Sequence, residues 1–326
     1  MRYYDIALFD SSGATSSAAA PFRRWSSHPN GQYDPAAPQV EFDMPVTAYG
    51  TPTGAQTITI HGVPLQDLSQ AYKLAGMELV VTGGMKQGLP LANPNQAGLL
   101  LKGQVFQSYG NWQGTDMRLD LVVYPSQYTS DLPGNFVVNW LPGQSLASAL
   151  KATLSTVYPN IPVSINIGQN LVFDTTEVHF CATLEDLAQY VSNLTASVFK
   201  QEVTITLQAG KFVIFDKTYQ PSPIQIAFTD LIGQPTWIQP DVMQMKTVMR
   251  ADLQIGSAIT MPQGFQNAPG LITTLGSSLP SSIKYQSTFQ NNFTVTDIRH
   301  LGNYRSSAGE DWATVFNCFE GAGYGQ

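Results

Sequence analysis

Charged side chains are scarce in this sequence. Asp, Glu, Lys and Arg make up 12% of its 326 residues, about half of the roughly 25% that is usual in soluble proteins. The formal net charge is -7, and no cluster of Lys and Arg provides the positive surface that binds nucleic-acid phosphates. The nearest is Arg23-Arg24, between Phe22 and Trp25. The composition disfavours a nucleic-acid-binding protein, and a weakly charged polar surface suits a β-rich chain covered by other subunits.

Cysteine and histidine are also rare. Cys181 and Cys318 lie far apart and fit no metal-ligand spacing, so two buried thiols are expected, with a disulfide as the alternative. The four histidines lie in separate elements, and the one metal-like pair, His179-x-Cys181, has no second pair to complete a site. No metal and no cofactor are expected.

Long hydrophobic runs are missing as well. No segment approaches the roughly 18 apolar residues that a membrane span needs, and the N-terminus lacks the apolar core of a signal peptide. The sequence therefore predicts a soluble protein without membrane insertion.

Catalytic motifs are absent from the chain. It contains no Gly-x-Ser-x-Gly, no His-Glu-x-x-His and no glycine-rich loop that opens a helix. Glu41 and Asp43 share a strand face and could act as paired carboxylates, as a glycosidase requires. Such pairs occur in every β protein, so we assign no catalytic residue and expect a protein that is not an enzyme.

Strand-like alternation dominates residues 1–130. Strands are predicted at the N-terminus and near 40–44, 56–60, 77–81, 103–109 and 117–124, with an amphipathic helix over 64–75. Residues 11–39 have neither helical nor strand periodicity and are predicted to form a long interaction arm that carries Phe22, Trp25 and Tyr33. A flexible surface loop is the alternative.

Residues 131–220 follow a different pattern, in which a strand and then a helix occur twice. Helices are predicted to begin after the N-cap residues Ser145 and Thr183. Strands are predicted near 136–140 and 178–181, as a pair at 163–167 and 170–173 over Gly168-Gln169, and as a pair at 203–207 and 211–215 across Ala209-Gly210. This segment is predicted to be an inserted small α+β domain. From 221 to 326 the pattern is β-like again, with strands near 242–261, 293–301 and 312–319, a polar loop at 262–282 and a tail at 320–326.

A tripeptide occurs in both β-like segments, as Gly110-Asn111-Trp112 and as Gly302-Asn303-Tyr304. Gly and Asn tolerate left-handed backbone angles, so each copy is predicted to be a hairpin turn between two strands. The chain would then contain one β unit twice, although chance in a glycine-rich chain remains the alternative.

The order of β unit, inserted strand-helix module and second β unit resembles the baseplate hub protein of contractile phage tails and the related late-control family. The stretch from Met249-Arg-Ala-Asp-Leu to Met-Pro262, with Val295-Thr-Asp-Ile-Arg-His-Leu-Gly-Asn-Tyr-Arg305, looks like the hub's second tube-like domain. The resemblance implies an α+β, mainly β fold. Two tube-like antiparallel β-barrel domains, over 1–130 and 221–326, would be related by the internal repeat and flank the inserted domain.

The resemblance also implies a function. Three copies would form a homotrimeric ring with pseudo-six-fold symmetry that joins the six-fold tail tube to the three-fold central spike. Expected partners are the spike protein and the tail tube protein, with the tape measure and baseplate wedge proteins as further candidates, and DNA would only pass through the lumen. The protein would reside in the virion tail baseplate after assembly in the cytoplasm of the host bacterium. The chain is shorter than the best-known hubs, so contacts made through a further C-terminal domain are not carried over.

Exposed aromatic, arginine and asparagine residues of the arm and of the two tripeptides are the candidate subunit interface: Phe22, Arg23, Arg24, Trp25, Tyr33, Asn111, Trp112, Asn303, Tyr304 and Arg305. Two alternatives stay open. A tail tube or distal tail subunit would be hexameric and would not need two β units. A carbohydrate-binding β protein would use Trp25 or Trp112 against sugar.

Overall fold

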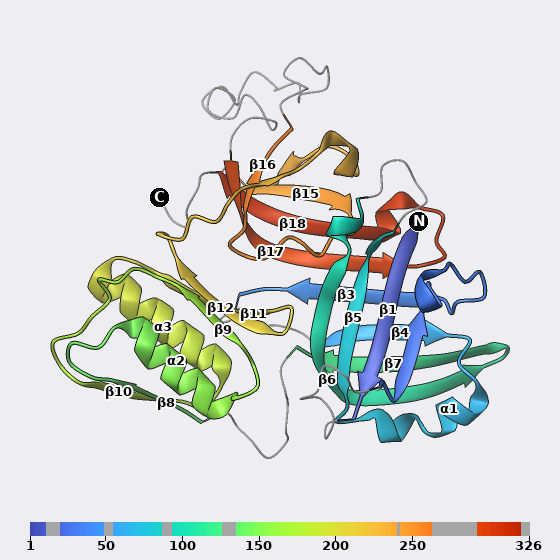
Figure 1. Ribbon diagram of the computed structural model, residues 1–326, viewed down its shortest axis with the longest axis horizontal. Coiled ribbons are helices and arrows are strands. Elements are labelled where there is room, and N and C mark those ends of the chain that lie inside the picture. The colour runs from blue at the N-terminus through green and yellow to red at the C-terminus, as the bar shows by residue number, and fades with distance from the viewer. Residues whose placement is uncertain are drawn as a thin grey trace.

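Most strand pairs in the computed structural model are antiparallel, and the structure describes residues 1–10, 20–48, 55–86, 93–125, 135–239, 242–262 and 292–320. Strands from both ends of the chain form a 13-stranded sheet, and the residues between them form a module with two smaller sheets (Figure 1). No helix within these ranges is long and apolar enough to cross a membrane. The protein is mainly β, as predicted.

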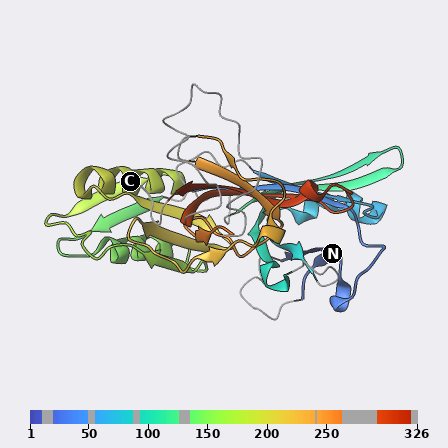
Figure 2. The same cartoon turned by 90° about the horizontal axis from the view of Figure 1, so that it is seen from above.

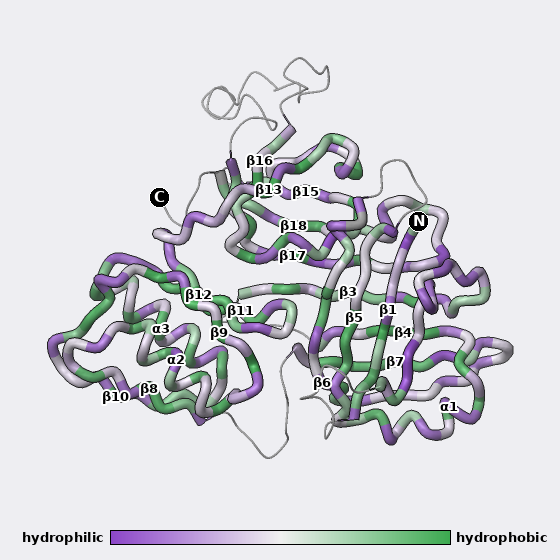
Figure 3. Tube along the Cα trace, viewed as in Figure 1, coloured by the Kyte–Doolittle hydropathy of each residue, from purple (hydrophilic) through white to green (hydrophobic). Residues whose placement is uncertain are grey.

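The N-terminal part contributes the strands β1 (Arg2–Phe9), β2 (Arg23–Ser26), β3 (Val40–Val46), β4 (Gln56–His61), β5 (Glu78–Met85), β6 (Gly98–Gln113) and β7 (Asp116–Tyr124). Hydrophobic and hydrophilic residues alternate along β4 and β7 (Figure 3), so each strand has one buried face. The long strand β6 pairs with β5 through its first half and with β7 through its second. It thereby links two layers that cross each other in Figure 1, and the core of this part lies between them.

The C-terminal part contributes β13 (Ile224–Gln225), β14 (Thr236–Trp237), β15 (Val242–Val248), β16 (Ala258–Thr260), β17 (Asn292–Asn303) and β18 (Trp312–Glu320). The polar loop predicted at 262–282 and the tail at 320–326 fall almost entirely outside the described residues. Strand β17 pairs with β3, from Ile298 opposite Val46 to Asn303 opposite Glu41. This pairing joins the two ends of the chain into one sheet.

The expected pair of closed barrels is corrected by the strand order. Among the described residues the main path runs from β14 through β15, β18, β17, β3, β4, β7, β6, β5 and β1 to β2 and does not close on itself. The reason is the β3–β17 pairing, which uses backbone groups that two separate barrels would each need for their own closure.

The module contains β8 (Phe136–Trp140), α2 (Leu146–Val157), β9 (Val163–Asn166), β10 (Glu177–Cys181), α3 (Leu184–Phe199), β11 (Val203–Gln208) and β12 (Lys211–Asp216). Both helices begin where predicted, because the hydroxyls of Ser145 and Thr183 accept hydrogen bonds from backbone N–H groups of the first turn. The predicted strand pair over residues 163–173 is wrong. Strand β9 instead pairs in parallel with β12, and Val172 forms only an isolated bridge with Ser145.

Strand β12 belongs to two hydrophobic cores. Phe212 and Ile214 pack among the helices of the module, whereas Val213 and Phe215 pack in the core of the C-terminal part. Successive side chains of a strand point to opposite faces, so one short strand connects the module firmly to the large sheet.

The predicted long arm is wrong for its described part, while residues 11–19 lie outside the described residues. Strand β2 pairs with β1, from Leu8 opposite Arg23 to Asp5 opposite Ser26. Ser27 is fully buried, and its hydroxyl accepts the backbone N–H of Tyr4 at 2.9 Å. Pairing across more than a dozen intervening residues leaves no local periodicity, which is why the sequence pattern missed this strand.

The helix predicted over 64–75 is corrected to two shorter pieces. The structure has α1 (Leu65–Ser69) followed by a 3-10 turn (Ala71–Leu74). The buried residues are Leu68, Ala71 and Leu74, a spacing of three that matches the 3-10 repeat instead of the α-helical one.

Neither Gly-Asn pair lies in a turn. Gly110 lies inside β6, and the chain reverses at Gly114 and Thr115, where Gly114 has φ +60. Gly302 lies near the end of β17, opposite Trp312. Both glycines are needed for close packing. A Cβ on Gly110 would lie 2.5 Å from the carbonyl oxygen of Leu68, and one on Gly302 would lie 2.3 Å from the ring of Phe42.

The hairpin between β11 and β12 gives a test of backbone strain. Ala209 has φ +49 and Gly210 has φ +70, and a two-residue turn with both angles positive favours glycine. We expect Ala209→Gly to raise the free energy of unfolding by about 0.5–1 kcal/mol, since the left-handed region costs a non-glycine residue about that much after the entropy of glycine is counted. Urea unfolding measures the change.

Gly210→Ala is the matched control and should destabilise the protein, because its Cβ would lie 2.8 Å from the Lys102 side chain. A loss of stability in Ala209→Gly would show that the backbone of Ala209 is not strained.

Candidate functional site

Two of the predicted interface arginines lie on β2 and are paired within the chain. Nε and Nη2 of Arg24 each donate to a carboxylate oxygen of Asp5 on β1 at 2.8 Å, and this hydrogen bonding raises the pKa of Arg24. Arg23 forms an ion pair with Asp67 of α1. Both arginines therefore hold β2 against its neighbours.

The aromatic residues of the same segment differ in exposure. Phe22 is half exposed, whereas Trp25 is partly buried against the core. Together with α1 they line a cavity of ≈ 20 Å³, room for about one water molecule. Tyr33 is half exposed and its ring lies 5.7 Å from that of His28. Of these residues, Phe22 and Tyr33 are the ones that could meet another subunit.

The second tripeptide lies at a contact inside the chain. Nε2 of Gln39 donates to Oδ1 of Asn303 at 2.6 Å, and the backbone N–H of Arg305 donates to Oε1 of Gln39 at 2.7 Å. Nη1 of Arg2 donates to the carbonyl oxygen of Asn303 at 2.7 Å. Tyr304 is buried in the core. These residues fasten the end of β17 to the N-terminal part.

The first tripeptide is the exposed one. Trp112 is 62% exposed, and its Nε1 donates to the carbonyl oxygen of Gly114 at 2.8 Å. Asn111 donates to the carboxylate of Asp120 at 2.6 Å. Figure 2 shows the β6–β7 hairpin projecting from the body of the molecule. The ten predicted interface residues thus occupy three separate places, and this hairpin is the most accessible.

The possible catalytic carboxylates are engaged elsewhere. Asp43 is paired with Arg299, whose Nε donates at 2.7 Å, and Oε1 of Glu41 accepts from Gln39 at 3.2 Å and from Asn303 at 3.3 Å. Both carboxylates are therefore occupied by donors from the same chain. This geometry supports no glycosidase site.

The candidate metal pair does not form a site either. His179 is exposed and stacks on Tyr190, with ring centroids 3.8 Å apart, whereas Cys181 is buried. Within the described ranges no three His, Cys, Asp or Glu residues gather as metal ligands. Cys181 and Cys318 are both buried and free, and burial raises the pKa of the Cys318 thiol.

The sequence pattern missed a buried charge cluster. Arg250 is 1% exposed, and it donates to Asp252 through Nε at 2.7 Å and to Asp230 through Nη1 at 3.2 Å. Its backbone N–H donates to Oγ1 of Thr314 at 3.0 Å. The available signal was Arg250-x-Asp252 in a mostly apolar stretch of a chain that has few charges.

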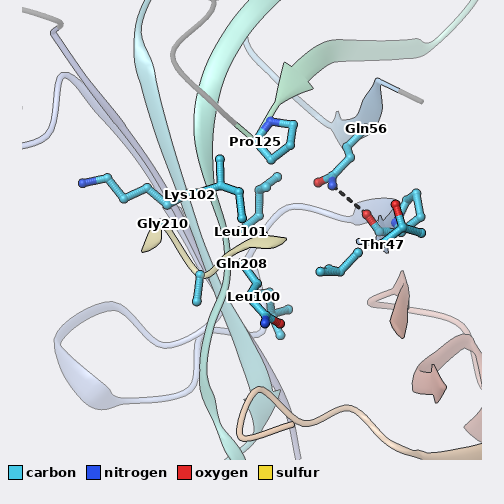
Figure 4. Close-up of a pocket in the computed structure, with 12 residues that line it drawn as sticks. Thr47, Gln56, Leu100, Leu101, Lys102, Pro125, Gln208 and Gly210 are labelled. Carbon is cyan, nitrogen blue, oxygen red and sulfur yellow. Dashed lines mark hydrogen bonds between the residues drawn. The ribbon is translucent and has the colours of Figure 1, made fainter. Parts of the chain in front are cut away.

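The junction between the module and the large sheet is a closed contact. The β11–β12 hairpin places Gln208 and Gly210 near Leu100, Leu101 and Lys102 of β6 (Figure 4). The remaining cavity has a volume of ≈ 20 Å³, too small for a ligand. This junction therefore positions the module and offers no binding pocket.

Of the comparisons with known proteins, the one with solved structures finds proteins that share this fold. No family model matches the chain, and no curated protein matches its sequence. Among solved structures, the E. coli c3393 protein, a type VI secretion component similar to the T4 bacteriophage tail proteins gp27 and gp5, has a TM-score of 0.53 and 10% identity over 88% of this chain and 76% of that one. The 43 kDa tail protein of prophage MuSo2 from Shewanella oneidensis has a TM-score of 0.52 and 9% identity, over 97% of this chain and 96% of its own. A chain of a PdpA–VgrG complex has a TM-score of 0.52 and 7% identity over 98% of this chain and 65% of that one. At these identities the likeness shows a shared fold, that of phage tail and type VI secretion proteins.

Proposed function

We propose that this chain is a structural, non-enzymatic hub subunit of a contractile phage tail. Three copies would form a ring with pseudo-six-fold symmetry between the six-fold tail tube and the three-fold central spike. Residues 1–130 and 221–326 act as the two tube-like units in this proposal, and 131–220 act as the inserted module. The fold shared with phage tail and type VI secretion proteins supports the assignment.

One observation carries the proposal: the same strand order occurs twice in the large sheet. In the first unit β4 pairs with β7, β7 with β6 and β6 with β5. In the second unit β15 pairs with β18, β18 with β17 and β17 with β16. The third strand of each set has a β-bulge, between Val105 and Gln107 in β6 and between Val295 and Asp297 in β17. A chain that contains one unit twice can meet both a three-fold and a six-fold partner.

The repeat also suggests how copies would join. Beyond its bulge, β17 pairs with β3 of the first unit, whereas β6 beyond its bulge has β7 on one side and no strand on the other among the described residues. The short strand β14 ends the sheet path at the second unit. In the proposed ring, the end strand of one subunit lies beside the free side of β6 in the next, close to Asn111 and Trp112. The pairs made by Asn303 and Arg305 are then the equivalent contact within one chain.

Native mass spectrometry of the purified chain tests the proposal. A trimer is expected at micromolar concentration. Trp112→Ala should weaken the trimer by about 2 kcal/mol, a shift of about thirtyfold in dissociation constant, since a large exposed aromatic is the usual anchor of an interface. Tyr72→Ala is the control, because Tyr72, in the 3-10 turn that follows α1, is 70% exposed and is no candidate interface residue. A monomer or a hexamer would overturn the trimeric hub, and sugar binding lost in Trp112→Ala would favour a carbohydrate-binding protein.

A further inference from the structure

Gln56 is a buried glutamine in a row of inward-facing isoleucines. It is the first residue of β4, where Ile58 and Ile60 occupy the other buried positions, and it is 4% exposed. Its Nε2 donates to the carbonyl oxygen of Pro45 at 2.8 Å, and because a carbonyl only accepts, this bond fixes the orientation of the amide. Oε1 of Gln56 is also buried, and no group of the described chain donates to it. Buried polar atoms almost always have a hydrogen-bond partner, so this oxygen points to a bound donor.

A second oxygen of this kind borders the same cavity. Oγ1 of Thr47, the residue after β3, is buried and lacks a hydrogen-bond partner within the described ranges. Thr47 and Gln56 both line the cavity of ≈ 20 Å³ at the β11–β12 hairpin (Figure 4). Lys102 is the one charged residue in the described lining, and its ammonium group is paired with Glu78 at 3.0 Å. Two unpaired oxygens, one after β3 and one on β4, therefore border one small and nearly uncharged space.

The size and the chemistry of this cavity fit one water molecule. A buried water needs about 10–15 Å³ of such space and two or more polar partners, and the cavity offers ≈ 20 Å³ and two unpaired oxygens. Each O–H group of a water can donate to one of them. An anion without a proton has nothing to donate, and a metal ion such as Ca²⁺ would need about six or more oxygen ligands. An organic ligand is too large for the space.

We propose that one water molecule is bound in this cavity, where it donates one hydrogen bond to Oε1 of Gln56 and one to Oγ1 of Thr47. The water satisfies both oxygens, so that both polar atoms of the Gln56 amide have a partner at an inward position of β4. The site lies where the module packs on the large sheet, and the water fills space that would otherwise lack packing contacts there. The proposal does not depend on the hub function.

A crystal structure of the full chain at high resolution tests the proposal directly. It should show one ordered water within about 2.7–3.2 Å of both Oε1 of Gln56 and Oγ1 of Thr47. An empty cavity, or a protein group bonded to either oxygen in place of the water, would overturn the proposal.

Thr47→Val tests the same site in solution, because valine keeps the branched shape of the side chain and removes the hydroxyl. If the water is bound, the variant loses a hydrogen bond, and the equilibrium constant of unfolding in urea experiments should rise about fivefold. If Oγ1 is unpaired, its removal should make the protein more stable. Thr57→Val is the matched control, since Thr57 is exposed on the outer face of β4 and should change the constant by less than about twofold. An unchanged or smaller constant in Thr47→Val would exclude the bound water.

Discussion

Arg250→Met is expected to lower the free energy of unfolding by about 3–5 kcal/mol, the cost of breaking a buried ion pair by removing one partner. The side chain of Arg250 is 2% exposed and that of Asp230 is 7% exposed. Methionine fills a similar volume but donates no hydrogen bond. Among the described residues, the buried carboxylate of Asp230 then keeps one donor, the backbone N–H of Ala227 at 3.1 Å. Losing the same partner costs less at Asp252, because water reaches its side chain, which is 29% exposed. Urea unfolding measures the loss.

Arg299→Met is the matched control. Arg299 also pairs with a carboxylate, that of Asp43, but the two side chains are 57% and 47% exposed. Water screens such a pair, and its removal should cost less than about 1 kcal/mol. The double variant Arg250→Met/Asp230→Leu should recover part of the loss, since it removes the stranded charge. A cost for Arg250→Met no larger than that for Arg299→Met would show that Arg250 is not the buried charge described above.

Sequence patterns predicted the helix caps, a strand and a hairpin, because these features depend on residues that are close in sequence. Ser145 and Thr183 cap α2 and α3 because a hydroxyl at that position meets the free N–H groups of the first turn. The alternation of Gln56-Thr-Ile-Thr-Ile60 gave β4, and Ala209-Gly210 gave the β11–β12 hairpin, since both depend on residues that are neighbours in sequence.

Contacts between distant residues could not be predicted in this way. Gly110 and Gly302 were assigned to turns because glycine allows left-handed angles, but each is required by a group from another element, the carbonyl of Leu68 or the ring of Phe42. The repeat is better supported by strand order than by the tripeptide. Gly110 lies five residues after Val105, at the bulge of β6, and Gly302 lies seven residues after Val295, at the bulge of β17, so the two glycines are not equivalent when the bulges are aligned.

The candidate interface residues also depend on contacts that the sequence pattern could not predict. Aromatic, arginine and asparagine residues were chosen because they are typical of interfaces. Composition cannot tell whether the partner surface belongs to another copy or to the same chain. The structure pairs Arg24 with Asp5, and Asn303 with Gln39, inside one chain. Trp112, on the projecting hairpin, is the candidate that keeps most of its surface free.

The second large effect is a loss of stability in acid that arises from His300. This residue lies in β17 and is 3% exposed, and burial lowers its pKa from 6.5 to about 4. Nδ1 of His300 lies 3.0 Å from Oγ1 of Thr314, the same hydroxyl that bonds the backbone of Arg250. Protonation would therefore place a second positive charge in the region of the buried arginine.

Whether stability rises or falls with pH depends on when the folded and the unfolded chain take up a proton on His300. Above pH 6.5, the ordinary pKa, the imidazole is neutral in both the folded and the unfolded chain. As the pH falls, the unfolded chain takes up a proton first, so stability decreases until the folded pKa of about 4 is reached. The total loss is about 3 kcal/mol, since each unit of pKa difference is worth about 1.4 kcal/mol.

Carboxylates also titrate in this range, so the test compares variants. Urea unfolding is measured between about pH 7 and pH 4 for the wild type, for His300→Gln and for His179→Gln. His300→Gln starts from a lower stability because its side chain fills the site less well, but its decrease with pH should be smaller than that of the wild type by about 3 kcal/mol. His179→Gln, at an exposed position of β10, should follow the wild type. If His300→Gln loses as much stability in acid as the wild type, other groups cause the decrease, among them the carboxylates and the buried His28, whose pKa is also lowered by burial. The imidazole of His300 then has no part in it.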